Sequence, residues 1–239
     1  MCNDDLGDPP AGCNDVADSL VIGALQLFAD RADAGKALAA ELESERNPQL
    51  VIVGLARGGV AVAAVVARAL QAPLDAVAVR KIGHPWQPEY GIGAVTPGDG
   101  VYVRGRYALT DEQMASAIEK ARQEADALDE KLHAELPRLE LAGKRVLVVD
   151  DGLATGATMI AALRWAKAAD VARVVAAVPV GAAETLSLVR AEADDVVCVH
   201  ALSSFGAVGA WYGSFEQVGD SDVVRLLVES RLALSSAGG

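Results

Sequence analysis

Short apolar runs alternate with longer segments of helical period along most of the chain. Runs of strand length occupy 49–54, 73–81, 145–149, 173–180 and 195–200. Segments with apolar residues at steps of three and four, or rich in alanine and valine, predict helices at about 30–45, 58–70, 110–136, from 155 onward, 183–191 and 221–232. Strands that are apolar on both faces are typical of parallel sheets. The alternation therefore predicts an α/β fold with a mainly parallel sheet of about five strands, flanked by helices on both faces.

The segment 83–106 interrupts this alternation, because it is dense in Gly and Pro and has no long period. Its apolar runs 92–95 and 101–104 flank the sequence TPGDG, which indicates a hairpin. Thr110 and Gln113 then have the spacing of a capping box, which marks the start of the 110–136 helix.

The 110–136 helix carries one apolar seam, formed by Met114, Ile118, Ala121, Ala125, Leu128 and Leu132. That seam packs either on the chain's own sheet or on a second copy in a homodimer. His133, near the end of this helix, is expected on its exposed side.

Composition indicates one globular domain preceded by a tail. The chain has 239 residues, of which 52% are hydrophobic, enough to bury a sizeable core. Residues 1–20 are rich in Asp, Gly, Pro and Asn. We therefore expect a disordered tail over 1–20 and a single domain over 21–239.

The charge balance narrows the range of partners. A net charge of −12, from 21 basic and 33 acidic residues, argues against a nucleic-acid partner, which needs a basic face. The N-terminus has no basic-then-apolar leader, and no apolar run approaches the roughly 20 residues that cross a bilayer. We expect a cytoplasmic protein without a membrane partner. The three cysteines lack metal or disulfide spacing, and the three histidines are too scattered for a metal site.

The chemical signal is concentrated in the sequence VLVVDDGLATGAT, 146–158. Its apolar run predicts a central strand, so Asp150 and Asp151 lie at the carboxyl end, where open α/β sheets bind ligands. The small and hydroxyl residues 154–158 lead into a helix whose first amides can bind a phosphate. Carboxylates accept hydrogen bonds, so the acid pair suits sugar hydroxyls. The pattern fits neither a P-loop nor a dinucleotide fingerprint, and it indicates a sugar phosphate.

This sequence resembles the ribose-phosphate motif of the type I phosphoribosyltransferases. The sequences GLARGGVAVA, VRKIGHPWQPEYGIGAV and FGAVGAWYGSFEQVGDSDV extend the resemblance over most of the chain, to a bacterial subgroup whose base substrate is unassigned. The resemblance implies the type I phosphoribosyltransferase fold. It places a flexible catalytic loop at about 83–106 and a small C-terminal hood at about 203–220.

The resemblance also implies roles for individual residues. Asp150 and Asp151 would hold the ribose 2- and 3-hydroxyls. The other substrate-binding positions are Ala154, Thr155, Gly156, Ala157 and Thr158 around the 5-phosphate, Arg57, Gly58 and Gly59 in the pyrophosphate loop, and Arg80 and Lys81 at the end of the second strand, facing the pyrophosphate. A cis peptide is implied between Ala56 and Arg57.

The implied reaction transfers a 5-phosphoribosyl group from phosphoribosyl pyrophosphate to a nitrogenous base and releases pyrophosphate, as in nucleotide salvage. Mg²⁺ would accompany the substrate, held through the pyrophosphate and ribose with the acid pair nearby, so no separate metal site is expected. The implied catalytic residues are Asp150, Asp151, Arg57, Lys81 and Glu89. The expected partners are phosphoribosyl pyrophosphate, a small base and, through the helix seam, a second copy of the chain.

The acceptor base is open. Ala154 stands where 6-oxopurine enzymes have an Asp, and 179–185 has no Lys, whereas Glu89-Tyr90-Gly91 resembles a loop of adenine phosphoribosyltransferase. Trp211 and Tyr212, with Phe205 and Phe215, either stack on a base or anchor the C-terminal segment on the core. The alternatives to a general phosphoribosyltransferase are adenine phosphoribosyltransferase and a non-catalytic protein that senses phosphoribosyl pyrophosphate.

Overall fold

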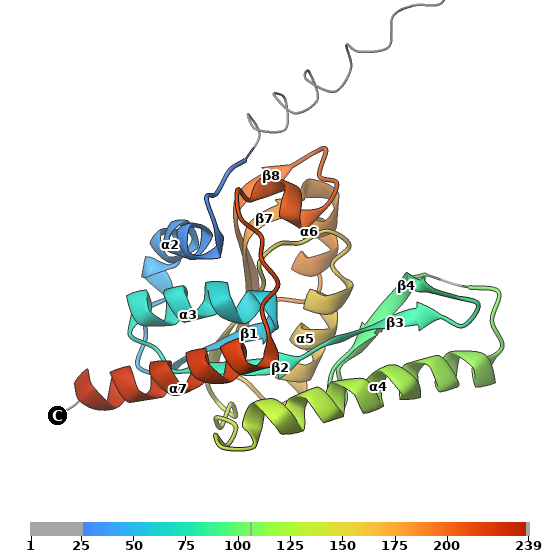
Figure 1. The fold of residues 1–239 in the computed structure, drawn as a ribbon, viewed down its shortest axis with the longest axis horizontal. Coiled ribbons are helices and arrows are strands. Elements are labelled where there is room, and N and C mark those ends of the chain that lie inside the picture. The colour runs from blue at the N-terminus through green and yellow to red at the C-terminus, as the bar shows by residue number, and fades with distance from the viewer. Residues whose placement is uncertain (1–25, 106, 238–239) are drawn as a thin grey trace, which may run out of the picture.

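The main sheet has five parallel strands in the order β2-β1-β6-β7-β8. The computed structural model describes residues 26–105 and 107–237, and Figure 1 shows their arrangement. The strands are β1 (Leu50–Ala56), β2 (Leu74–Ala78), β6 (Arg145–Val149), β7 (Arg173–Ala182) and β8 (Asp195–Leu202). The predicted parallel sheet is confirmed, with β6 at its centre. The tail expected over 1–20 lies outside the described residues.

Parallel pairing brings the ends of β1 and β6 to the same edge of the sheet. Ile52 pairs with Leu147, and Gly54 with Val149. The residues that follow β1 therefore lie beside Asp150, although about 95 residues separate them along the chain. This register brings the residues 57–59, which follow β1, close to the acid pair that follows β6.

Helices cover both faces of the sheet, as the alternating buried side chains require. Leu50 and Ile52 belong to one core with α2 (Arg31–Glu41), α3 (Gly58–Leu70), α7 (Asp220–Ala237) and the C-terminal part of α4 (Asp111–His133). Val51 and Val53 point to the opposite core, with α5 (Ala157–Ala168) and α6 (Ala183–Arg190). A 3-10 turn, η1 (Glu43–Glu45), follows α2.

A second, antiparallel sheet projects from one side of the body together with α4 (Figure 1). We call β3 (Arg80–His84), β4 (Gln87–Val95), β5 (Val101–Val103) and α4 the arm. The apolar run 73–81 is predicted as one strand, but it divides at Val79. Arg80 and Lys81 therefore begin β3 rather than ending a strand of the main sheet.

The structure answers the question of the α4 seam. Ala121 packs with Ile82 and Ile92 in the core of the arm, whereas Leu128 and Leu132 join the main core. The seam is buried within one chain from Ala121 to Leu132, and Met114 and Ile118 are partly buried against the arm. The predicted capping box between Thr110 and Gln113 is present.

The segment from 203 to 219, which we call the hood, pairs with the chain just before α2. The amide of Leu27 donates to the carbonyl of Trp211 at 3.0 Å, and that of Gly213 to the carbonyl of Phe28 at 2.8 Å. Phe28 and Tyr212 are buried against each other beside η2 (Val208–Trp211). The hood is thus fastened by a short strand-like pairing. Over the described ranges, no helix is long and apolar enough to cross a membrane.

His133 lies in a buried polar cluster, so its predicted exposure is wrong. Its Nε2 lies 3.0 Å from Oδ1 of Asp75, and its Nδ1 lies 3.3 Å from Oδ1 of Asp129. Asp75 is 1% exposed on β2 and also accepts a hydrogen bond from the Leu139 amide at 2.8 Å. Burial alone lowers the pKa of His133, but the bonds to Asp129 and Asp75 outweigh it and raise that pKa to about 9. The imidazolium therefore joins α4 to β2.

We predict that stability falls at alkaline pH as His133 loses its proton. The contribution is complete below the ordinary pKa of 6.5 and disappears as pH rises through about 9. A shift of this size is worth on the order of 3 kcal/mol. Melting curves between pH 6 and 10 should show the melting temperature of the wild type falling by several degrees more than that of His133→Gln. Parallel profiles in the two proteins would contradict this role for His133.

Candidate functional site

The acid pair stands at the carboxyl end of β6, partly covered by neighbouring segments. The Asp151 amide donates to Oδ1 of Asp150 at 2.9 Å, and the nearby Thr158 side chain acts to lower the pKa of Asp150. Only 14% of the Asp151 side chain is exposed. The two carboxylates are therefore held in place by the turn that follows them.

Two buried carboxylates side by side resist ionisation. Burial and the charge of Asp151 raise the pKa of Asp150 well above its ordinary value. Burial also raises the pKa of Asp151, although the Arg31 guanidinium opposes that rise. Ionising both members of this pair therefore costs free energy in the folded protein, which is typical of a functional site.

The turn after the acids presents the start of α5. Gly156 is the N-cap, with φ of 77°, a left-handed conformation that favours glycine. The helix begins at Ala157, two residues later than the predicted start near Thr155. The Thr185 hydroxyl donates to the Ala154 carbonyl at 2.8 Å and fixes the turn. The first amides of α5, which have no partners within the helix, can therefore bind an anion.

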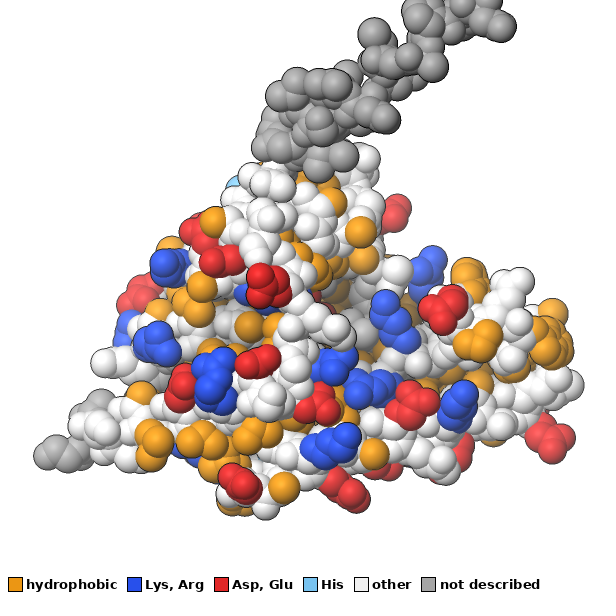
Figure 2. Space-filling view, viewed as in Figure 1, with side chains coloured by type: hydrophobic (Ala, Val, Ile, Leu, Met, Phe, Trp, Pro, Cys, Tyr) orange, Lys and Arg blue, Asp and Glu red, His pale blue; other side chains and the backbone are white. Residues whose placement is uncertain are grey.

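These groups line one cavity of about 440 Å³. It is bounded by Asp150, Asp151 and the 152–158 turn, by Lys81, Glu89, Tyr90 and Arg104 from the arm, and by Val208 from the hood. In Figure 2 the surface is hollowed between the body and the arm, and Lys and Arg side chains gather beside the hollow. The structure thus brings the predicted acid pair, the residues 154–158, Lys81 and Glu89 together.

The loop after β1 touches the acid pair through its glycines. A Cβ on Gly58 would lie 2.1 Å from Oδ2 of Asp151, and one on Gly59 would lie 2.7 Å from the Val149 carbonyl. Any side chain here would displace the acids, so close approach requires glycine at both positions. The Ala56–Arg57 peptide is cis, as the resemblance implied.

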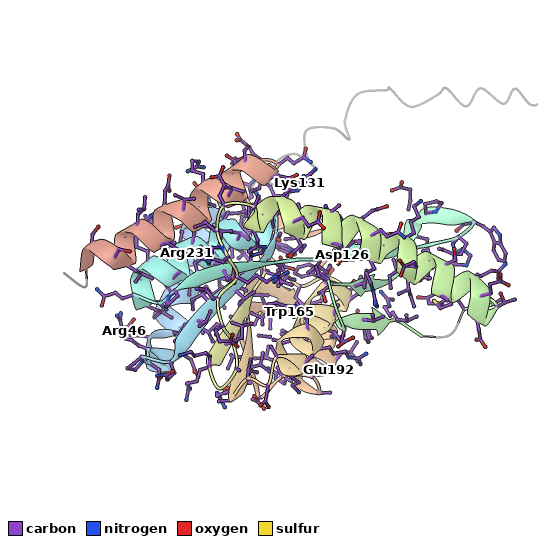
Figure 3. The ribbon with its side chains drawn as sticks, turned by 90° about the horizontal axis from the view of Figure 1, so that it is seen from below. Arg46, Asp126, Lys131, Trp165, Glu192 and Arg231 are labelled. Atoms are coloured by element: carbon purple, nitrogen blue, oxygen red, sulfur yellow. The ribbon has the colours of Figure 1, made fainter. Side chains whose placement is uncertain are left out.

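The predicted pyrophosphate cations Arg57 and Arg80 do not line this cavity. Nη1 of Arg57 lies 3.3 Å from Oδ1 of Asp220, at the start of α7. Lys131 approaches the same carboxylate at 3.9 Å, and Figure 3 shows it where α4 meets α7. Burial and the charge of Arg57 lower the pKa of Arg80, so the two guanidinium groups are neighbours. They form a cationic group beside the cavity rather than in its wall.

The hood aromatics fit the anchoring alternative. Tyr212 is 3% exposed, and its hydroxyl donates to the Asp151 carbonyl at 2.5 Å. The Trp211 indole donates to the Phe205 carbonyl at 3.0 Å. Neither Trp211 nor Tyr212 lines the cavity, and Val208 is the hood residue that does. The expected stacking of these rings on a base therefore finds no support in the geometry.

Sequence reasoning missed Arg31, which touches the acid pair directly. Its Nε donates to Oδ2 of Asp151 at 2.8 Å across 120 residues of sequence. It also missed Arg104 and Val208 in the cavity wall. Arg31 and Arg104 lie outside the sequences that carry the resemblance, and Val208 lies within FGAVGAWYGSFEQVGDSDV as an ordinary aliphatic residue, so no local pattern singled out any of the three.

The acid pair offers oxygen ligands to a cation, but not a complete set. Within the part of the chain that the structure describes, no three or more His, Cys, Asp or Glu side chains gather as a metal site. Mg²⁺ is commonly bound by one or two carboxylates together with phosphate oxygens of a substrate. The donor set therefore suits a cation that arrives with a phosphorylated ligand.

Comparisons with known proteins agree with this geometry. The family model for the phosphoribosyl transferase domain matches residues 24–210. A protein of Mycobacterium tuberculosis H37Rv, named "Putative phosphoribosyl transferase", is 40% identical over 219 residues, which are 90% of this chain and 49% of that protein. The chain thus spans about half the length of the curated relatives it matches. The crystal structure of TT1426 from Thermus thermophilus is 40% identical, with a TM-score of 0.72 over 84% of this chain and 98% of the other. By its fold and by the family model that covers most of its length, the chain belongs to the type I phosphoribosyltransferase family.

Proposed function

We propose that this chain transfers a 5-phosphoribosyl group from phosphoribosyl pyrophosphate to a nitrogenous base and releases pyrophosphate. The observation that carries the proposal is the single cavity in which Asp150 and Asp151 face the start of α5. The carboxylates suit two vicinal hydroxyls, and the helix amides suit a phosphate. A ribose 5-phosphate carries vicinal hydroxyls and a phosphate in one small molecule.

In this reaction a bond forms between a base nitrogen and C1 of the ribose, and the bond from C1 to the pyrophosphate oxygen breaks. The pyrophosphate leaves with the electron pair, and positive charge develops on the ring. Asp150 and Asp151 hold the ring by its hydroxyls and stabilise that charge. Glu89, which lines the same cavity, is the carboxylate available to accept the proton that the base nitrogen loses.

Charge on the leaving group is neutralised by cations. Lys81 lines the cavity, and Arg57 and Arg80 lie beside it. Asp150 and Asp151 are the residues that would hold Mg²⁺ together with substrate oxygens, and the metal would supply charge neutralisation when bound.

One observation favours adenine among the purines. Glu89, Tyr90 and Gly91, which resemble a loop of adenine phosphoribosyltransferase, all line the cavity. The wall near Ala154 carries neither the acid nor the lysine that a 6-oxopurine enzyme would use.

We predict that replacing both acids abolishes turnover. Charge-assisted hydrogen bonds are worth about 1.5–3 kcal/mol each, so Asp150→Asn with Asp151→Asn should cost about two to four powers of ten. Release of pyrophosphate from labelled phosphoribosyl pyrophosphate, over a panel of bases and with Mg²⁺, measures this. Asp126→Asn, on α4 and outside the cavity wall, is the matched control and should keep full activity.

The same panel separates the alternatives. Release with adenine alone identifies the specific enzyme, and tight binding without release on any base identifies a sensing protein. If the wild type neither binds nor cleaves phosphoribosyl pyrophosphate, the proposed function is wrong.

The two acids should differ in their effect on stability. Asp150→Asn replaces a buried carboxyl whose ionisation is opposed by burial and by Asp151, so it should raise the melting temperature by a few degrees, at about 2–4 °C per kcal/mol. Asp151→Asn breaks the ion pair with Arg31 and should lower it. Thermal unfolding at pH 7 tests this difference in sign, and a rise in both variants would show that the Arg31 pair contributes nothing to stability.

The outer part of the arm should respond to the substrate. Gly83 to Gly91 includes two exposed aromatic side chains, Trp86 at 65% and Tyr90 at 54%. We predict that amides in this segment exchange hydrogen faster than those of β6 and slow when phosphoribosyl pyrophosphate and Mg²⁺ are added. Hydrogen exchange by mass spectrometry measures the change. Equal protection with and without the ligand would contradict a lid role.

A further inference from the structure

Arg31 makes three contacts from the first turn of α2. Its Nε donates to Oδ2 of Asp151 at 2.8 Å, and its Nη1 donates to the Glu216 carbonyl at 2.7 Å. Its guanidinium carbon lies 3.8 Å from the centre of the Phe215 ring. Only 13% of the Arg31 side chain is exposed. The planar guanidinium is thus held on all sides and has a fixed orientation.

The contact with Arg31 still allows the Asp151 carboxylate to accept a hydrogen bond from a ligand. Arg31 donates a single hydrogen bond to Oδ2, and a carboxylate has lone pairs on both oxygens that can also accept from a ligand hydroxyl. An aspartate side chain can rotate about its terminal bond, and a bond to one oxygen restrains that rotation. Arg31 therefore selects one orientation of Asp151.

The same guanidinium lies against the loop after β1. A Cβ built on Gly58 would lie 3.1 Å from Nη2 of Arg31 and 2.1 Å from Oδ2 of Asp151. Arg31, Asp151 and Gly58 are thus in mutual contact. A displacement of the Arg31 side chain would therefore change the packing of both Asp151 and Gly58.

The hood is fastened to the same point by two routes. Arg31 bonds the carbonyl of Glu216, while the Tyr212 hydroxyl bonds the backbone carbonyl of Asp151. The pairing between 27–29 and 211–214 adds backbone hydrogen bonds on the outer side. Val208, the hood residue in the cavity wall, therefore depends on a segment that Arg31 ties to Asp151.

We propose that Arg31 is the positioning residue of the ribose site, which orients the Asp151 carboxylate for its hydroxyl and couples the hood to that acid. The inference rests on the proposed function, because it assigns Asp151 to ribose. It goes further by predicting that a residue outside every motif controls affinity for the sugar and leaves affinity for free pyrophosphate unchanged.

The test compares three probes by calorimetric titration. Phosphoribosyl pyrophosphate and ribose 5-phosphate are titrated with Mg²⁺, and inorganic pyrophosphate is titrated without it, because Asp151 is one of the residues that would hold the metal. Arg31→Gln should weaken binding of the two sugar ligands by about tenfold or more, the worth of one charge-assisted bond. Pyrophosphate affinity should stay within about twofold, because the cations that would bind it lie elsewhere. Steady-state kinetics should show a raised KM for phosphoribosyl pyrophosphate together with a lowered kcat.

Three further variants separate positioning from a loss of structure. Arg31→Lys restores the charge and should recover part of the lost sugar affinity, whereas a role in folding alone predicts no selective recovery. Phe215→Leu removes the ring against Arg31 but keeps the ion pair, so it should lower the melting temperature and cost less sugar affinity than Arg31→Gln. Arg225→Gln removes an exposed cation of α7 and is the charge control.

The outcomes of this test separate the positioning role of Arg31 from the proposed phosphoribosyl transfer. A wild type that binds phosphoribosyl pyrophosphate, with Arg31→Gln binding it equally well or losing pyrophosphate affinity to the same degree, overturns the positioning role alone. A wild type that binds no sugar ligand overturns the proposed function, and the inference with it. A selective loss for the two sugar ligands supports both.

Discussion

The structure depends on holding two carboxylates side by side at the end of a buried strand. Repulsion and burial both oppose the charged state of Asp150, as its raised pKa shows. Several neighbouring features compensate for this. The Asp151 amide donates to Asp150, the Arg31 guanidinium pairs with Asp151, and two glycines bring the start of α3 close without a side chain. The register of β1 on β6 makes that last contact possible.

Much of this organisation could be predicted from the sequence. Apolar runs located the five strands, and the run into Asp150 placed the acids at a carboxyl end, because both signals are local. The division at Val79 could not be seen, since the apolar pattern continues through it and only the tertiary fold separates β2 from β3. His133 was misplaced for a similar reason. Its partner Asp75 lies 58 residues away, within a strand whose other residues are apolar, so the sequence does not reveal the contact.

The aromatic residues of the hood show the limit of reasoning from residue type. Tyr212 and Trp211 near a sugar-phosphate motif suggested stacking on a base, yet their polar atoms bond backbone carbonyls and their rings fill a small core. What the hood contributes to the cavity is the aliphatic Val208. A contact such as that of Arg31 with Asp151 joins positions with no periodic relation, and only the folded chain reveals it.

The arm is joined to the body through the β2–β3 connection, through α4, and through the packing of β4 and β5 on α5, and this limits how the cavity can close. Val79 alone separates β2 from β3, and α4 is a continuous helix whose two ends belong to different cores. A rigid-body rotation of the whole arm would disrupt the packing of α4 in one of those two cores. Bending is possible further out, where the β3–β4 register shifts around Gly83. A closing movement that bends the β3–β4 hairpin at Gly83 would therefore carry Glu89 and Tyr90 toward the cavity and leave Lys81 in place.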